Sequence, residues 1–207
     1  HLPDSMRKIR VIHLPKTIDN DYHGIDFTFG YFSAVDILSK ELRNLRADAQ
    51  ASSTYFVVEA MGRKAGWLSY GIAIAGEADL VMSIEDISGD LLIDETTTDT
   101  DTGKSKIEKR INLDVFLHKL VSLIDNRYKQ KKKWGVIVLA EGITEMLPST
   151  FTSHLAKDEH GHLALSKSGN LGKTIADLLS NVNEQKTGRS QKITGVQLGY
   201  ESRCTTP

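Results

Sequence analysis

Cysteine is almost absent from this chain of 207 residues, since Cys204 is the only one. A single thiol cannot close an internal disulfide, so a disulfide-stapled fold is excluded and a reducing cytoplasm is the expected compartment. Long apolar runs are missing too. No stretch approaches the roughly 20 apolar residues that span a bilayer, and no signal-peptide pattern is visible. We therefore expect a cytoplasmic protein without membrane partners.

An excess of charge of one sign is also lacking. The formal net charge is −1 and the isoelectric point is near 6.7. No global field therefore favours binding to nucleic acid or to a membrane surface. The basic run "KQKKK" (129–133) closes a predicted helix, where cations suit the negative end of the helix dipole. The length of 207 residues allows one large α/β domain, or one domain plus pieces of a second. The fractions of 40% hydrophobic and 26% charged residues are typical of a soluble globular protein.

Apolar runs alternate along the chain with amphipathic stretches. Such alternation predicts βαβ units, and hence a mainly parallel sheet with helices on both faces. The predicted strands are 10–14 ("RVIHL", ended by Pro15), 54–61, 78–84, 134–142 and 192–200. One helix is predicted at 64–78. Three more are predicted from apolar residues at spacings of three and four, and Asn112 is the expected N-cap of the second. Their stripes are Val35, Leu38, Leu42 and Leu45 in the first; Leu113, Phe116, Leu117, Leu120 and Ile124 in the second; and Leu171, Ile175, Leu178 and Leu179 in the third.

Two polar segments interrupt this alternation. Residues 86–111 are rich in turn formers and predict an exposed excursion or a short hairpin. Residues 147–167 form a second excursion, which contains His160 and His162. These histidines lack a third ligand at suitable spacing, so a surface turn is favoured over a metal site.

Polar segments lie at the carboxyl ends of several predicted strands or directly after them. They are "PKTIDND" (15–21), "MGRKAG" (61–66), "EG" (141–142) and "YESR" (200–203). In an open parallel sheet, ligands bind beyond the carboxyl ends of the strands. We therefore expect these segments to meet in one crevice. Taken singly, each also fits an ordinary exposed turn, because proline, asparagine and aspartate are common turn residues.

The residue types in these segments suit phosphoryl transfer to a hydroxylated acceptor. Asp19 is placed to accept a hydroxyl proton while that oxygen attacks phosphorus, and Asp21 to hold the base or orient a metal-bound water. Lys16 brings a compact positive charge to the transferring phosphate. Arg63 adds a guanidinium fork at a helix start, where backbone N–H groups favour anions.

Three further side chains extend this predicted site. The Thr17 hydroxyl is expected to donate to the transferring group, the Glu141 carboxylate to accept bonds from sugar hydroxyls, and Arg203 to bind phosphate. A lone Glu141 or a lone Arg63 would more often be plain surface charge. Their joint placement at strand ends is what favours a site.

Together, "PKTIDND", "VEAMGRKAGW" and "LAEG…LGYESR" resemble the phosphofructokinase family over essentially the whole chain. The chain is most similar to the pyrophosphate-dependent branch, diphosphate–fructose-6-phosphate 1-phosphotransferase. The resemblance implies a reversible glycolytic enzyme that is cytoplasmic and homo-oligomeric, with Mg²⁺ as cofactor. It implies Asp19 as the base for the 1-hydroxyl of fructose 6-phosphate. It also implies a substrate site formed by Thr17, Ile18, Met61, Gly62, Arg63, Glu141, Tyr200, Glu201, Ser202 and Arg203.

Lys16 bears on the phosphoryl donor. In the family, ATP-using members commonly carry glycine there and pyrophosphate users carry lysine, although lysine also occurs in some ATP-using relatives. Pyrophosphate brings no adenosine binding energy, so its site must hold a small anion by electrostatics. The alternatives are an ATP-dependent 6-phosphofructokinase and a non-catalytic regulatory subunit that binds sugar phosphates. Such a subunit should have lost the base, whereas Asp19 and Asp21 are both present.

The family pattern is not complete. Arginines that many members carry stand here as Thr54 and Thr194, and Arg46 or Lys64 are candidates to replace them. The family's donor and magnesium segment is expected upstream of His1, with Asp21 as a donor- or metal-associated residue, so we expect the chain to be an internal fragment. By resemblance, residues 1–29 end the donor-binding domain, 30–197 form the fructose 6-phosphate domain, and 198–207 return toward the first domain.

Overall fold

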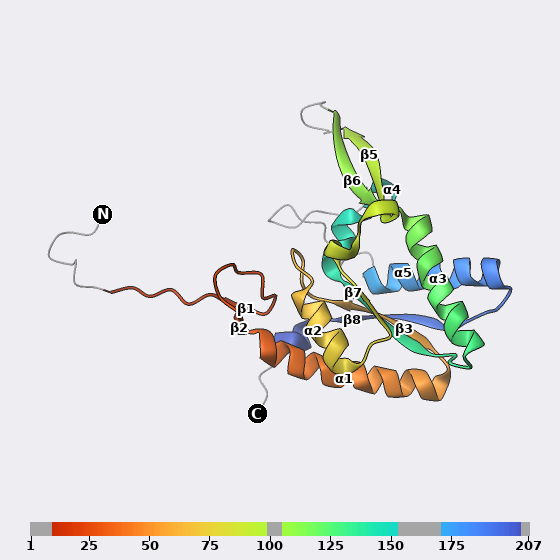
Figure 1. Cartoon of the computed structure of the whole chain (residues 1–207), viewed down its shortest axis with the longest axis horizontal. Coiled ribbons are helices and arrows are strands. Elements are labelled where there is room, and N and C mark those ends of the chain that lie inside the picture. The colour runs from red at the N-terminus through yellow and green to blue at the C-terminus, as the bar shows by residue number, and fades with distance from the viewer. Residues whose placement is uncertain (1–9, 99–104, 153–170, 204–207) are drawn as a thin grey trace.

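The computed structural model describes residues 10–98, 105–152 and 171–203 (Figure 1). At its centre is a four-stranded sheet with the order β4-β7-β3-β8, in which every pairing is parallel. The predicted parallel α/β sheet is confirmed, and four of the five predicted strands lie in it. These strands are β3 (Tyr55–Ala60), β4 (Leu80–Met82), β7 (Gly135–Ala140) and β8 (Ile193–Leu198).

Helices cover both faces of the sheet. The helices α1 (Tyr31–Ser52) and α2 (Trp67–Gly76) pack on one face, where Val58 and Val138 join their core. On the other face lie α3 (Leu113–Lys129) and α5 (Leu171–Thr187), in a second core that includes Val57 and Ile137. Successive strand residues point to opposite faces, so β3 and β7 must be apolar at nearly every position. This explains why both segments read as continuous apolar runs.

The apolar stripes place the helices as predicted. On α1, Leu38 and Leu42 have no exposed surface, while Val35 and Leu45 are partly buried against the same core. The predicted cap of α3 is present, because the Asn112 side chain accepts a hydrogen bond of 3.3 Å from the backbone N–H of Val115. Among the described helices, none has both the length and the apolarity needed to cross a bilayer.

The excursion at 86–111 contains an antiparallel hairpin, which Figure 1 shows projecting from the body. Its strands are β5 (Leu92–Thr98) and β6 (Ser105–Ile111). Of the second excursion only 147–152 are described, so His160 and His162 lie outside the described residues. The remaining short elements are η2 (Ile84–Asp86), η3 (Gly89–Leu91), η4 (Glu141–Met146), α4 (Ser149–Thr152) and η6 (Tyr200–Arg203).

The prediction of a buried strand at 10–14 is wrong. These residues form no regular structure, and Val11, Ile12 and Leu14 are 83%, 84% and 79% exposed. A strand needs a neighbour to bond its backbone, and within the described chain none lies along this segment. Pairing begins only at β1 (Lys16–Thr17), which runs parallel to β2 (Phe29–Gly30). In Figure 1 the segment extends as an arm away from the sheet.

Candidate functional site

Three adjacent strands end at one level and deliver three of the predicted site segments together. Ala60 of β3 pairs with Ala140 of β7 and with Leu198 of β8. The segments that follow, 61–66, 141–142 and 200–203, therefore leave the sheet side by side at its carboxyl edge. The predicted convergence of these segments is what the topology produces.

The first loop is held in shape by its own polar side chains. The Thr17 hydroxyl accepts a bond of 3.2 Å from the backbone N–H of Asp19, and the Thr28 hydroxyl donates 2.7 Å to the Thr17 carbonyl. Asn20 has a left-handed backbone (φ 55°), which asparagine tolerates, and its side-chain oxygen accepts 2.8 Å from the Thr28 N–H. Asp19 is thus fixed on a closed loop.

Charges of both signs act on Asp19. Burial raises the pKa of this carboxyl above its usual value of 3.8, and the neighbouring charge of Asp21 raises it further. The guanidinium groups of Arg203 and Arg63 oppose this and lower the pKa. The first, second and last predicted segments therefore act on one carboxylate, and the net shift is upward.

Arg63 and Glu141 face each other across the same site. The Nε of Arg63 lies 3.9 Å from Oε1 of Glu141 and 3.9 Å from Oε1 of Glu145. Burial raises the pKa of Glu141, Arg63 lowers it, and the charge of Asp19 raises it again. The guanidinium of Arg63 therefore lowers the pKa of both Asp19 and Glu141, and the two carboxylates also influence each other.

Two glycines make the close approach of these loops possible. Gly62 has φ 117°, a conformation that L side chains rarely adopt, and its backbone bonds to Glu141 and lowers the pKa of that carboxyl. A Cβ on Gly142 would lie 2.2 Å from the carbonyl oxygen of Arg63. The loops after β3 and β7 therefore pack backbone to backbone.

The segment after β8 is joined to the segment after β3. Ser202 is 1% exposed, and its hydroxyl contacts the Met61 sulfur at 3.2 Å. Glu201 accepts 2.9 Å from the Gly199 N–H, which closes the turn locally. Arg203 is exposed at the end of η6, which begins at Tyr200. Of these residues, Arg203 is the one whose charge acts on Asp19.

The remaining predicted residues lie on the first loop. Lys16 is exposed on β1, and Asp21 is exposed two residues beyond Asp19. Ile18 is partly buried and packs against the α1–α2 core. Lys16 is thus solvent-accessible beside the Asp19 loop, while Ile18 anchors that loop to the body.

A cavity of about 850 Å³ adjoins the Asp21 side of this loop. It is lined by residues 20–27, by Tyr31 and Trp67, and by Lys64, Ala65 and Glu85. Asp19, Arg63 and Glu141 are not among its lining residues, so the charged cluster lies beside this space and not within it.

Among the described residues of this site, carboxylates are the groups that could bind a metal ion. Within the described residues, no group of three or more His, Cys, Asp and Glu side chains converges as a metal site would. Mg²⁺ commonly binds one or two carboxylates together with substrate phosphates. Asp21, beside Asp19, fits the first part of that requirement.

Sequence reasoning missed two residues of the site. Asn20 shapes the Asp19 loop, and its signal was the tolerance of asparagine for left-handed turns. Glu145 shares Arg63 with Glu141. Its four-residue spacing from Glu141 was a weak signal, because "EGITE" was not predicted to be helical.

Comparison with known proteins gives a consistent result. The family model described as Phosphofructokinase matches residues 1–207. A pyrophosphate–fructose 6-phosphate 1-phosphotransferase of Naegleria fowleri is 37% identical over 210 residues, which cover 97% of this chain and 44% of that protein. An ATP-dependent 6-phosphofructokinase of Spirochaeta thermophila is 31% identical over 199 residues, covering 96% and 44%. The chain therefore spans less than half the length of these curated relatives.

Solved structures support the same fold. A pyrophosphate-dependent phosphofructokinase from Nitrosospira multiformis aligns with a TM-score of 0.55 at 20% identity, over 94% of this chain and 38% of that one. A phosphofructokinase from Saccharomyces cerevisiae aligns with a TM-score of 0.56 at 21% identity, over 93% and 19%. At these identities the likeness concerns the fold alone.

Proposed function

Because this chain belongs to the phosphofructokinase family, we propose that its protein transfers a phosphoryl group from pyrophosphate to the 1-hydroxyl of fructose 6-phosphate. The product would be fructose 1,6-bisphosphate, and the reaction would be reversible. The observation that carries the proposal is the charged cluster in which Arg63 and Arg203 act on Asp19 while Arg63 also faces Glu141.

Asp19 is the proposed base. Its upward-shifted pKa makes it a stronger proton acceptor than an exposed aspartate. A bond from its own backbone N–H to Thr17 fixes its position on the loop. The carboxylate would take the proton of the 1-hydroxyl as that oxygen attacks phosphorus.

The two guanidinium groups are the proposed anion ligands. Arg63 and Arg203 come from the ends of neighbouring strands and can hold phosphate oxygens in bidentate fashion. Glu141 would accept hydrogen bonds from the sugar hydroxyls. Met61, Gly62, Tyr200, Glu201 and Ser202 would complete the sugar-phosphate site, as would Thr17 and Ile18.

Lys16 is the residue that favours pyrophosphate over ATP. Its ammonium is exposed next to the Asp19 loop and is open to a diphosphate. A donor without an adenosine must be held by charge, and a lysine supplies that charge as a compact point. The match to an ATP-dependent relative at 31% identity keeps ATP as the second candidate donor.

Mg²⁺ is proposed as the cofactor, with Asp21 as one of its ligands. Bound there, the ion would neutralise charge on the donor phosphates. The residues of this chain would supply only part of its coordination, since the phosphates and further protein groups would complete it.

We propose the domain boundaries of the family for this chain, with 1–29 and 198–207 belonging to the donor-binding domain and 30–197 forming the sugar-phosphate domain.

We also propose a homo-oligomer. Thr54, where many relatives carry arginine, is 1% exposed, so it offers nothing to a neighbouring subunit. Arg46 is engaged by Glu77 at 3.2 Å and by the Trp134 ring, whereas Lys64 is exposed and lines the cavity. Of the two candidate replacements, Lys64 is the better placed.

The test is an assay of the full-length protein with fructose 6-phosphate and either donor. Turnover with pyrophosphate is expected; turnover with ATP alone would reject the proposed donor. Turnover with neither, together with tight binding of fructose 6-phosphate, would indicate a regulatory subunit instead.

Asp19→Ser should lower kcat by about 10²-fold or more, because the base is lost while the loop keeps its backbone bonds. Asp26→Asn is the control, since it removes a carboxylate from the same loop without touching Asp19's charge partners. A kcat within a few-fold of the parent for Asp19→Ser would remove the proposed role of Asp19.

A further inference from the structure

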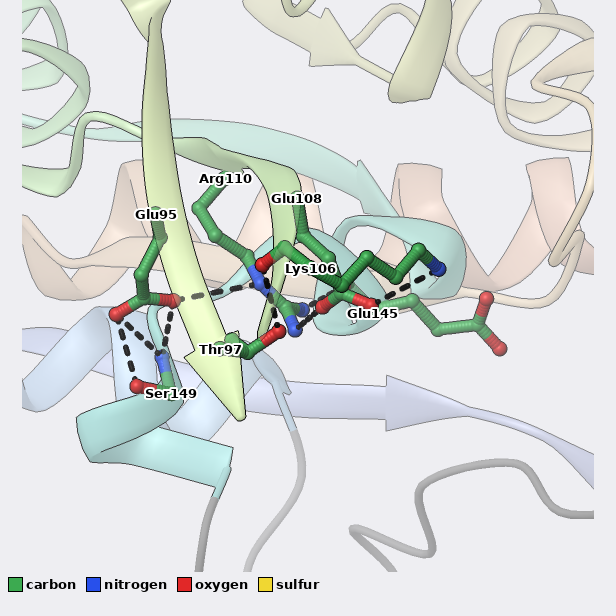
Figure 2. A network of polar contacts seen from close by, with 7 residues as sticks. All are labelled: Glu95, Thr97, Lys106, Glu108, Arg110, Glu145 and Ser149. Carbon is green, nitrogen blue, oxygen red and sulfur yellow. Dashed lines mark hydrogen bonds and ion pairs between the residues drawn. The ribbon is translucent and has the colours of Figure 1, made fainter. Parts of the chain in front are cut away.

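One face of the β5–β6 hairpin holds a polar network, drawn in Figure 2. Glu95 of β5 and Glu108 of β6 are direct cross-strand partners, an arrangement in which like charges repel. Arg110 lies two residues from Glu108 on the same face of β6. Its Nε is 3.4 Å from Glu95, and its Nη2 donates to Glu108. The Arg110 side chain is only 14% exposed and contacts both carboxylates, so its positive charge offsets their repulsion.

Arg110 also reaches out of the hairpin. Its Nη1 donates a bond of 2.6 Å to the main-chain carbonyl of Glu145, in η4. Glu95 accepts 3.0 Å from the backbone N–H and 2.8 Å from the hydroxyl of Ser149, at the start of α4. Figure 2 shows the hairpin side chains bridging to both of these segments. The hairpin is therefore hydrogen-bonded to Glu145 and to Ser149, which lie on either side of residues 147–148.

The segment η4, which the hairpin contacts, carries two of the carboxylates of the site. Glu141 and Glu145 both belong to η4, and each lies 3.9 Å from the Nε of Arg63. Gly142 packs against the Arg63 backbone with no room for a Cβ. Close-packed contacts transmit small displacements, so a shift of η4 changes how Glu141 stands against Arg63.

We propose that Arg110 is a positioning residue for the sugar-phosphate site, acting through η4. It sets the distance between Glu141 and Arg63 without contacting substrate. This proposal rests on the proposed function, because Arg63 and Glu141 are the sugar-phosphate ligands there.

Arg110→Gln should raise the KM for fructose 6-phosphate by about tenfold while kcat stays within about threefold. The reason is that loosened ligands weaken ground-state and transition-state binding alike. The KM for the phosphoryl donor should stay near the parent value. Loss of folded protein alone would instead lower the apparent kcat without moving either KM.

Lys106→Gln is the matched control. Lys106 is on the same strand and face, is 74% exposed, and pairs with Glu108 at 3.3 Å. The Lys106→Gln substitution removes one positive charge from the hairpin but leaves the hydrogen bond from Arg110 to Glu145 in place. An equal rise of KM in both variants would overturn the proposal, because the rise would then result from the loss of a positive charge and not from the loss of the hydrogen bond between Arg110 and η4.

Arg110→Lys decides if Arg110→Gln fails to fold. It keeps the charge between the two glutamates but lacks the fork that also reaches the Glu145 carbonyl. A raised KM with parent-like thermal stability supports the proposal, and an unchanged KM overturns it.

Hydrogen exchange of the backbone amides at 141–146 gives a readout that needs no substrate. Exchange there should be faster in Arg110→Gln than in Lys106→Gln, and equal rates would contradict the link between hairpin and η4. A parent that does not use fructose 6-phosphate would refute the proposed function, while the exchange comparison would still decide whether Arg110 positions η4.

Discussion

The pKa of Asp19 responds to charged residues from three segments of the site. Burial and Asp21 raise its pKa, while Arg203 and Arg63, brought from other strand ends, lower it. Each of these residues was predicted from its place after a strand. Their opposing influence on one carboxyl depends on three-dimensional distances, which the sequence does not contain.

Asp21→Asn should move the acidic limb of the pH profile of kcat/KM to lower pH. Under the proposed function Asp19 is the base and must be ionised to act, so this limb should follow the pKa of Asp19. Removing the negative charge of Asp21 removes one of the causes that raise that pKa, so the Asp19 carboxyl loses its proton at lower pH than in the parent.

The measurement is kcat/KM across the acidic range for the parent, Asp21→Asn and Asp26→Asn. Asp26→Asn should leave the limb where it is. A limb that stays in place or moves upward in Asp21→Asn would contradict the arrangement of the two carboxylates.

Residue-scale prediction failed where the signal was a single side chain with a local role. Asn20 was not singled out, although it closes the loop through Thr28. Glu59 was read as part of an apolar strand, yet it is a buried carboxylate that accepts 3.3 Å from the Gly172 N–H, and burial raises its pKa. A charge inside an apolar run is a recognisable signal, but its partners are set by tertiary packing.

At the scale of elements, helix α5 and strand β8 approach each other unusually closely. A Cβ on Gly195 would lie 2.3 Å from the Cα of Lys173, which is a backbone atom and cannot turn aside. Gly172 on the helix is similarly confined, because a Cβ there would lie 2.9 Å from the carbonyl oxygens of Val57 and Val196. The two glycines let helix and sheet touch through their backbones.

Gly195→Ala should therefore destabilise the chain by about 1–3 kcal/mol, because α5 must move off the sheet. Gly199→Ala is the matched control, since a Cβ there meets nothing within 4 Å. The comparison is the free energy of unfolding from denaturant titration. Equal losses of unfolding free energy in the two variants would show that α5 can shift away from the sheet at little cost.

Element prediction succeeded wherever burial on both faces leaves a continuous apolar run, as in β3 and β7. It also succeeded for helices with one apolar stripe, of which α3 is the clearest. It failed for residues 10–14, because an apolar run records a tendency toward burial but not the neighbour that provides it. The hairpin was foreseen only as one of two alternatives, since its turn-rich composition does not fix its pairing.

At the scale of the molecule, the chain divides into a packed body and an extended arm (Figure 1). The body contains two apolar cores, one on each face of the sheet. The arm at 10–14 exposes apolar side chains and contributes none of the buried core residues. The stability of the chain should therefore reside in the body.

Ile12→Ser in the 207-residue chain should change the free energy of unfolding by less than about 0.5 kcal/mol, as exposed substitutions usually do. Leu139→Ala, at a position with no exposed surface, should cost about 2–5 kcal/mol. Both are measured by denaturant unfolding at one temperature. A large loss for Ile12→Ser would mean that the arm packs against the body in solution.

The shared level at which β7, β3 and β8 end has a practical consequence for engineering. Loops rooted on aligned strand ends can be transplanted as a set from another family member, provided that no strand is lengthened or shortened. One inserted residue would lift its loop by about 3.3 Å and turn its first side chain to the opposite face. Attempts to alter the site at this edge of the sheet should therefore recombine whole loops and leave the strand lengths untouched.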